Sequence, residues 1–118
     1  MTVVNHLAGL AAEDQVVSHY TRRAHAVAAR RWRGRGGEID VILRDGDRIV
    51  FVEVKRARDC ATARYRLTRR QMDRIVRAGS EFLAGEPKGL LTETRFDLAL
   101  VDGQGRVEVI ENAFAEDW

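Results

Sequence analysis

The stretch EIDVILRDGDRIVFVEVK, residues 38–55, predicts two β-strands joined by a tight turn. Residues 38–44 and 48–55 are rich in β-branched side chains, which favour strands. Between them stands Asp45-Gly46, the strongest short signal for a hairpin. The stretch therefore predicts an antiparallel pair of strands.

The register of this hairpin decides which side chains share a face. If the Asp-Gly pair supplies the two central residues of the turn, Asp40 lies opposite Phe51. Because side chains alternate in direction along a strand, Asp40, Glu53 and Lys55 then point the same way. Asp40 and Glu53 become diagonal neighbours, roughly 7–8 Å apart at the backbone. A three-residue loop or a bulge would break this alignment.

Two carboxylates placed in this way can converge on one divalent cation. Carboxylate oxygens are ligands that Mg²⁺ prefers, and Mg²⁺ takes its remaining ligands from water and substrate phosphate. The ion polarises a phosphoryl group and lowers the pKa of bound water. Lys55, beside Glu53, would orient that water or offset charge in the transition state. The spacing therefore indicates phosphodiester hydrolysis.

The same spacing also fits a solvated sheet face that carries a Glu53–Lys55 ion pair. Against this alternative, the opposite face of the hairpin is wholly apolar: Ile39, Val41, Leu43, Val50, Val52 and Val54. The acid-bearing face also has large apolar residues, so we expect it to be covered: Ile42, Ile49 and Phe51. Acids in a covered face are often functional. Glu38 could replace either acid as a ligand, but a charged residue at the start of a strand is the more common explanation for its position.

The N-terminal region predicts a helix over residues 5–23, capped by Asn5, because apolar residues recur there at helical spacing. Glu13 falls inside the apolar stripe of this helix. An acid in that position is costly unless it is paired or metal-bound. Glu13, brought to the sheet by this helix, could therefore bind a second ion or a metal-bound water.

The remaining elements complete an α/β fold. Residues 25–32 are a weak strand candidate, followed by a basic, Gly-rich turn at 33–37. Residues 67–84, with Thr68 as cap, predict a second helix. Two strands follow, at residues 95–101 and 106–110. The order α-β-β-β-α-β-β predicts a central mixed sheet flanked by helices, with a parallel pair across the second helix.

The composition places limits on the class of protein. A chain of 118 residues predicts a single domain, 1–118. With one cysteine, Cys60, no intrachain disulfide and no thiolate metal cluster can form, which favours a reducing cytoplasm. No apolar run is long enough to cross a membrane, and no signal-peptide pattern begins the chain.

The charges divide unevenly along the chain. Residues 1–79 carry a balance of +8 and residues 80–118 a balance of −6, within a net charge of +2. Such a division can make one face that attracts a polyanion, although a bias toward arginine in the genome would also produce it. The candidate phosphate-binding residues flank the hairpin: Arg31, Arg33, Arg35, Arg56, Arg58, Arg64, Arg66, Arg69 and Arg70.

The motif GEID at residues 37–40, followed by FVEVK at 51–55, resembles the core of the PD-(D/E)xK nuclease superfamily. More narrowly, the chain resembles the YraN family of small bacterial proteins. Supporting residues extend over nearly the whole chain: Ala12-Glu13, Arg31-Trp32-Arg33, Gln71, Arg74, Ile75, Ala78, Arg95-Phe96-Asp97 and Asn112-Ala113-Phe114. The two motifs at this separation are specific for the superfamily, whereas either motif alone would be weak evidence for it.

The resemblance implies a restriction-endonuclease-like fold, similar to that of archaeal Holliday junction resolvases. It implies a catalytic set of Glu13, Asp40, Glu53 and Lys55, with the three acids as ligands of Mg²⁺ or Mn²⁺. Gln71 would be an auxiliary residue, standing where a lysine is usual. A symmetric homodimer would let two active sites cut opposing strands.

These observations lead to three hypotheses. The first is an Mg²⁺-dependent endonuclease acting on DNA, including branched or structured DNA. The second is a nucleic-acid-binding module that kept this fold without catalysis. The third is a protein-interaction domain that uses the acidic end of the chain, Glu116-Asp117-Trp118. The acid–acid–lysine set favours the first hypothesis, because binding alone does not require it.

Overall fold

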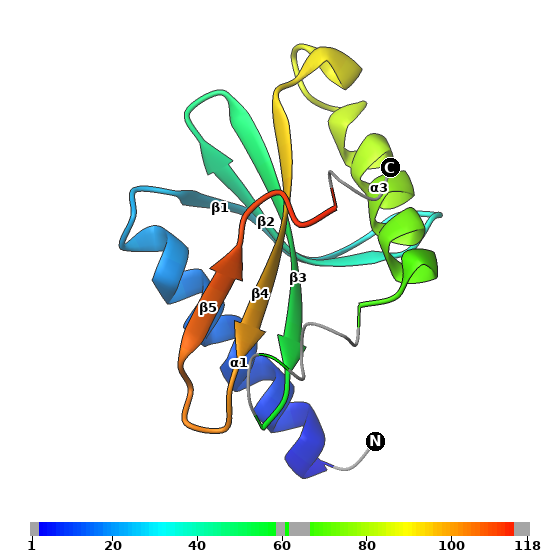
Figure 1. Ribbon diagram of the computed structural model, residues 1–118. Helices are drawn as coiled ribbons and strands as arrows, with labels where there is room; N and C mark the ends of the chain where they lie inside the picture. Colours follow the sequence, from blue (N-terminus) through cyan, green and yellow to red (C-terminus); the bar gives the residue numbers. More distant parts are fainter. Residues whose placement is uncertain (1–2, 59–60, 62–66, 115–118) are drawn as a thin grey trace.

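The computed structural model describes residues 3–58, 61 and 67–114, with side chains from residue 7 onward. In this part of the chain, a five-stranded sheet lies between two helices (Figure 1). The elements are α1 (Val3–Thr21), β1 (Ala26–Arg33), β2 (Glu38–Asp45), β3 (Arg48–Arg56), α3 (Arg69–Leu83), η1 (Gly89–Leu91), β4 (Thr94–Val101) and β5 (Val107–Ile110). The predicted mixed α/β fold is confirmed, and it is compatible with a nuclease-like fold.

The strands lie in the order β1-β2-β3-β4-β5. Strands β3 and β4 are parallel, as predicted from the crossover through α3, and the other neighbours are antiparallel. The weak strand candidate is confirmed as β1, which forms one edge of the sheet. No helix in the described ranges is long and apolar enough to span a bilayer.

The predicted register of the β2–β3 hairpin is wrong by two residues. Asp45 pairs with Arg48, so Gly46 and Asp47 are the central residues of the turn. Gly46 has a φ of 61°, a conformation that glycine adopts at little cost. Phe51 consequently pairs with Ile42 instead of Asp40. A shift of two residues keeps every side chain on its predicted face.

Each face of the sheet is covered by one helix. Ala12, Val16 and Tyr20 of α1 pack on buried valines and leucines of β2 and β3: Val41, Leu43, Val50 and Val52. Met72, Ile75 and Ala78 of α3 pack on the other face, with Ile42, Ile49 and Phe51. Each fully buried large apolar side chain contributes roughly 1.5–3 kcal/mol. Both faces of the hairpin are therefore covered, as predicted.

The helix ends agree only partly with the sequence. Helix α1 begins at Val3, so Asn5 lies inside it and the predicted cap is wrong. Thr68 caps α3 as predicted: its Oγ1 accepts from the Gln71 N–H at 3.2 Å. The Gln71 side chain in turn accepts from the Thr68 N–H at 3.0 Å, which completes a capping box.

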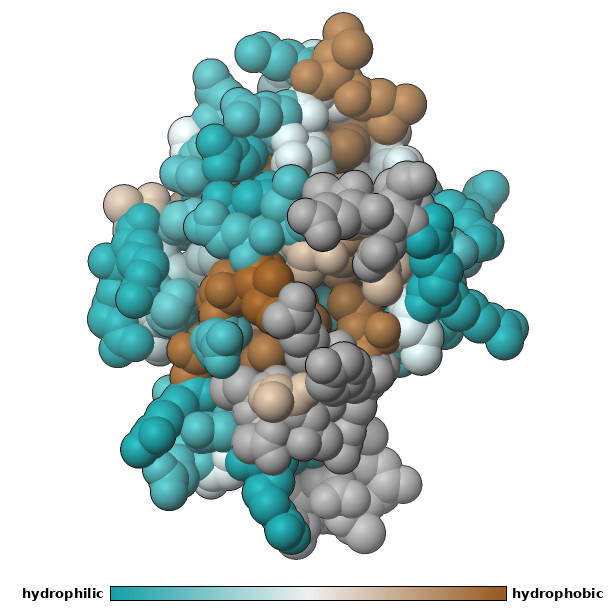
Figure 2. Space-filling view, in the orientation of Figure 1, coloured by the Kyte–Doolittle hydropathy of each residue, from teal (hydrophilic) through white to brown (hydrophobic). Residues whose placement is uncertain are grey.

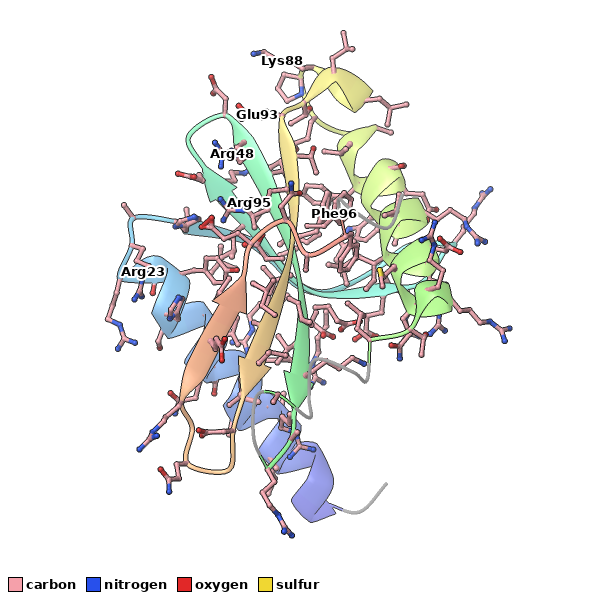
Figure 3. All side chains as sticks on the ribbon, in the orientation of Figure 1. Arg23, Arg48, Lys88, Glu93, Arg95 and Phe96 are labelled. Atoms are coloured by element: carbon pink, nitrogen blue, oxygen red, sulfur yellow. The ribbon has the colours of Figure 1, made fainter. Side chains whose placement is uncertain are left out.

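Asp97 on β4 is fully buried and holds three parts of the structure together. Its carboxylate accepts two hydrogen bonds from Arg95, at 2.8 and 2.9 Å. The side chain of Phe96, between these two residues on the strand, points toward α3 (Figure 3). It also accepts from the Tyr20 hydroxyl of α1 at 2.7 Å and from the Asn112 N–H at 3.0 Å. Burial and the neighbouring Asp97 charge raise the pKa of Tyr20 far above its ordinary range. Asp97 therefore ties α1 and the segment after β5 to the sheet.

We predict that Asp97→Ala lowers the free energy of unfolding by about 3–5 kcal/mol, because it leaves the mostly buried guanidinium of Arg95 with only the exposed Glu111, 3.5 Å away, as an acidic partner. Urea denaturation followed by circular dichroism measures this change. The matched control is Asp14→Ala, which removes an exposed partner of Arg30 and should cost no more than about 1 kcal/mol. Equal losses in the two variants would show that Asp97 is not the structural tie described above.

Candidate functional site

The candidate site lies where β2 and β3 separate. Their pairing runs from Asp45–Arg48 to Val41–Val52. Beyond that point, the first residues of β2 pair only with β1, and the last residues of β3 pair with β4. The Asp40 carboxylate accepts a hydrogen bond from the Val54 N–H at 2.8 Å. A side-chain carboxylate is thereby fixed at the fork between two strands.

Glu53 lies beside Asp40 at this fork. Burial raises the pKa of Glu53 well above its ordinary value, and both a hydrogen bond with Asp40 and the Asp40 charge raise it further. The charge of Lys55 acts in the opposite direction and lowers it. These effects show that the two carboxyl groups and the ammonium group are neighbours. The structure therefore brings Asp40, Glu53 and Lys55 together, as the shared face of the hairpin predicted.

Two small hollows meet at Asp40. The hollow on the α3 side is about 190 Å³ and is lined by Gly37, Glu38, Asp40, Glu53, Gln71, Arg74 and Ile75. The hollow on the α1 side is about 210 Å³ and is lined by Gly9, Ala12, Glu13, Asp40, Val54, Lys55 and Arg56. Since Asp40 lines both, it is the residue that joins the acids of the sheet to the acid of α1.

Glu13 is 7% exposed and its carboxylate is already paired. The Arg31 Nε lies 3.0 and 3.2 Å from its two oxygens, and an Arg30 nitrogen lies 3.7 Å away. The charge of Arg31 therefore compensates for the burial of the Glu13 carboxylate on α1. Among the described residues, no three His, Cys, Asp or Glu side chains form a group that could hold a metal ion.

The predicted phosphate-binding arginines have different surroundings. Arg31 is paired with Glu13, and Arg33 donates to Glu38 at 3.0 Å. Arg69 lies 3.8 Å from Asp73. The other described members have exposed positions: Arg35 on the β1–β2 turn, Arg56 and Arg58 at the end of β3, and Arg70 on α3. Arg64 and Arg66 lie outside the described residues. Phosphate binding by these residues stays a prediction.

The α3 side of the site contains one residue that the sequence analysis did not assign. Arg74 lines the hollow together with Asp40 and Glu53, and its side chain is exposed. Its position three residues after Gln71 was a usable signal, because residues three apart share a helix face. Gln71 lines the same hollow while its side chain caps α3, so an auxiliary role would have to be combined with capping.

Arg31 has a φ of 50°, in the left-handed region where side chains other than glycine are strained. We therefore predict that Arg31→Gly unfolds at a higher urea concentration than Arg31→Ala, although both lose the Glu13 ion pair. Urea midpoints of the two purified variants measure the difference. Arg30, the preceding residue of β1, provides the control, because glycine there should be less stable than alanine. A lower midpoint for Arg31→Gly than for Arg31→Ala would contradict this conformation.

Comparison with known proteins gives consistent matches. A family model described as "Uncharacterised protein family UPF0102" matches residues 12–101. A UPF0102 protein of Cereibacter sphaeroides is 60% identical over 112 residues, covering 95% of this chain and 96% of the relative. Another from Ruegeria pomeroyi is 60% identical over 110 residues, covering 93% and 89%. A third from Roseobacter denitrificans is 48% identical over 109 residues, covering 92% and 84%. The predicted resemblance to the YraN family, which is the same family, is confirmed.

Proposed function

The chain belongs to the UPF0102 family, and we propose that it is a metal-dependent endonuclease that hydrolyses phosphodiester bonds in DNA. The observation that carries the proposal is the acid pair at the β2–β3 fork. Asp40 and Glu53 are neighbours there, and Lys55 follows on the same strand. Binding alone does not require two neighbouring carboxyl groups beside a lysine, whereas metal-dependent hydrolysis does.

The donor groups at the fork fit Mg²⁺ or Mn²⁺. Burial, and after it the hydrogen bond and the charge of Asp40, raise the pKa of Glu53, and a divalent cation would offset the repulsion between the two carboxylates. Mg²⁺ in phosphate-handling sites is commonly held by one or two carboxylates, with water and substrate phosphate as its other ligands. Asp40 and Glu53 would hold the ion, and the family resemblance adds the carbonyl of Val54 as a further ligand. When bound, it polarises the phosphoryl group and lowers the pKa of a water molecule.

Lys55 would stabilise the negative charge that develops on the phosphoryl oxygens during attack. Its ammonium group is near enough to Glu53 to lower the pKa of that acid. A positive charge fixed in a partly buried site stabilises a developing anion without having to reorganise at the moment of reaction. Lys55 also lines the hollow that it shares with Glu13 and Asp40, where its charge would act.

Glu13 would join the site from α1 as a further ligand of the ion or of its bound water. The Arg31 guanidinium now neutralises it. Substrate phosphate would compete with Glu13 for Arg31, and the Glu13 carboxylate would then be free to face the shared hollow. Arg31 thus has two partners of the same chemical kind, one within the protein and one in the substrate.

The Glu13–Arg31 pair also favours the alternative, a nucleic-acid-binding module without catalysis. In such a module Arg31 would keep Glu13 neutralised at all times, and only two acids would face the fork. That protein would bind nucleic acid and cleave none of it with any metal. The two proposals therefore differ in turnover and not in binding.

We predict cleavage of DNA that requires Mg²⁺ or Mn²⁺ and stops in EDTA. The assay uses a panel of linear, nicked, flapped and four-way-junction DNA, because the family resemblance extends to junction resolvases. An Asp40→Ala, Glu53→Ala double variant and a Lys55→Ala variant should each lose activity by about 100-fold or more. The substrate that is cut fastest would identify the preferred class of DNA.

The chain offers matched controls for this assay. Lys88 is the other lysine of the chain, and Glu93 is an exposed acid. Both lie at the end of the molecule where Arg48 begins β3, away from the fork (Figure 3). Lys88→Ala and Glu93→Ala should cut as the wild type does. Wild-type binding without cleavage under both metals would replace the nuclease proposal with the non-catalytic module.

A further inference from the structure

The Gly-rich turn between β1 and β2 lies directly against α3. A Cβ atom added to Gly36 would lie 3.0 Å from the Arg77 Cβ and 3.1 Å from the Ala78 nitrogen. One added to Gly34 would lie 2.5 Å from Glu81 Oε2, and one added to Gly37 would lie 3.7 Å from the Arg74 Cβ. Positions 74, 77 or 78, and 81 form one face of a helix. The glycines therefore let the turn lie along that face.

Glu81 fastens the turn to the helix. Its two carboxylate oxygens accept hydrogen bonds from the N–H groups of Arg35 and Gly36, each at 2.8 Å. These two hydrogen bonds lower the pKa of Glu81, so the carboxylate stays charged. Successive backbone N–H groups that converge on one anion form a favourable anion-binding arrangement. The turn is thus held by charge as well as by close packing.

This docking places three exposed arginines side by side: Arg35 on the turn, and Arg74 and Arg77 on α3. We call these three residues the ridge. Figure 2 shows hydrophilic residues gathered at the edge of the molecule where the turn and α3 meet in Figure 1. Arg74 also lines the hollow that contains Asp40 and Glu53. The ridge therefore begins at the candidate active site and runs away from it along α3.

We propose that the ridge binds the phosphates of a DNA duplex that leads into the Asp40–Glu53 site, and that Glu81 is the positioning residue that keeps the ridge in place. This inference rests on the proposed function for the direction in which the duplex runs. Glu81 acts through the turn and does not touch substrate. Arg74 and Arg77 would contact phosphates directly.

Two features favour a duplex over a single strand. Arg74 and Arg77 lie on a rigid helix, about 4.5 Å apart along its axis, and a fixed array suits phosphates that are already regularly spaced. Single strands, in contrast, are commonly bound by stacking bases on aromatic side chains. The described aromatic residues nearest the ridge are engaged with each other, since Trp32 and Phe82 lie edge to face at 5.6 Å and pack into the core.

The first test measures the salt dependence of binding to a labelled duplex in EDTA, where no cleavage occurs. An Arg74→Ala, Arg77→Ala variant should lose close to two phosphate contacts. The negative slope of log K against log salt should then become less steep by about 1.8, since each contact in B-DNA contributes about 0.9 to its magnitude. The matched control is Arg22→Ala, Arg23→Ala, a pair of exposed arginines directly after α1, of which Arg23 lies on the side of the molecule opposite α3 (Figure 3). The slope of this control should match the wild type.

The second test uses the sign of the effect at Glu81. Removing a negative charge near DNA should tighten binding if only net charge matters. If Glu81 positions the ridge, Glu81→Ala should instead weaken duplex binding several-fold, and Glu81→Gln should restore part of it. Asp73→Ala, which removes another acid of α3, should bind as tightly as the wild type or more so. Thermal unfolding of each variant confirms that it is folded.

The outcomes separate the two proposals. If the wild type binds duplex through Arg74 and Arg77 but cleaves no DNA, the nuclease proposal is wrong and the proposed binding of phosphates by the ridge still holds. If the wild type cleaves DNA but the Arg74→Ala, Arg77→Ala variant has an unchanged salt slope, the proposed binding of phosphates by the ridge is wrong. Tighter binding by Glu81→Ala would overturn the positioning role, and a preference for single strands over duplex would overturn the choice of ligand.

Discussion

The hydrogen bond from the Val54 N–H to the Asp40 carboxylate stands at the point where β2 and β3 stop pairing. Two strands that separate leave backbone groups without ladder partners, and buried groups of this kind must be satisfied in some other way. Asp40 satisfies one of them with its side chain. The same contact fixes the direction of the Asp40 carboxylate and places it beside Glu53. The candidate site is therefore a consequence of how the sheet divides.

The two helices supply the other side chains that surround this fork. Helix α1 brings Glu13 to one side of Asp40, and α3 brings Gln71 and Arg74 to the other. Further along the sheet, the fully buried Asp97 ties α1 to β4, so that the first helix has a fixed position. Costly features gather near the fork, including a neighbouring acid pair and a left-handed Arg31. Such features are often found at functional sites, where the surrounding structure compensates for them.

The sequence predicted the elements and the shared face of the acids, because both depend on periodicity. The register of the hairpin was wrong, since Asp45-Gly46-Asp47 contains two overlapping turn signals and only the packing of both faces selects between them. The pairing of Glu13 with Arg31 could not be predicted, because it depends on a backbone conformation that arginine rarely adopts. The hydrogen bonds of Glu81 could not be predicted either, since they join Glu81 to Arg35 and Gly36, which lie 46 and 45 positions earlier in the chain.

The central claim is that Asp40 and Glu53 together form a site for a divalent cation, and thermal unfolding in the presence of Mn²⁺ tests it without any substrate. A ligand that binds only the folded state raises its stability in proportion to the logarithm of ligand concentration. The melting temperature of the wild type should rise steadily with Mn²⁺, while that of an Asp40→Asn, Glu53→Gln variant should not change. Identical responses in the two proteins, whether both rise or neither does, would contradict the claim.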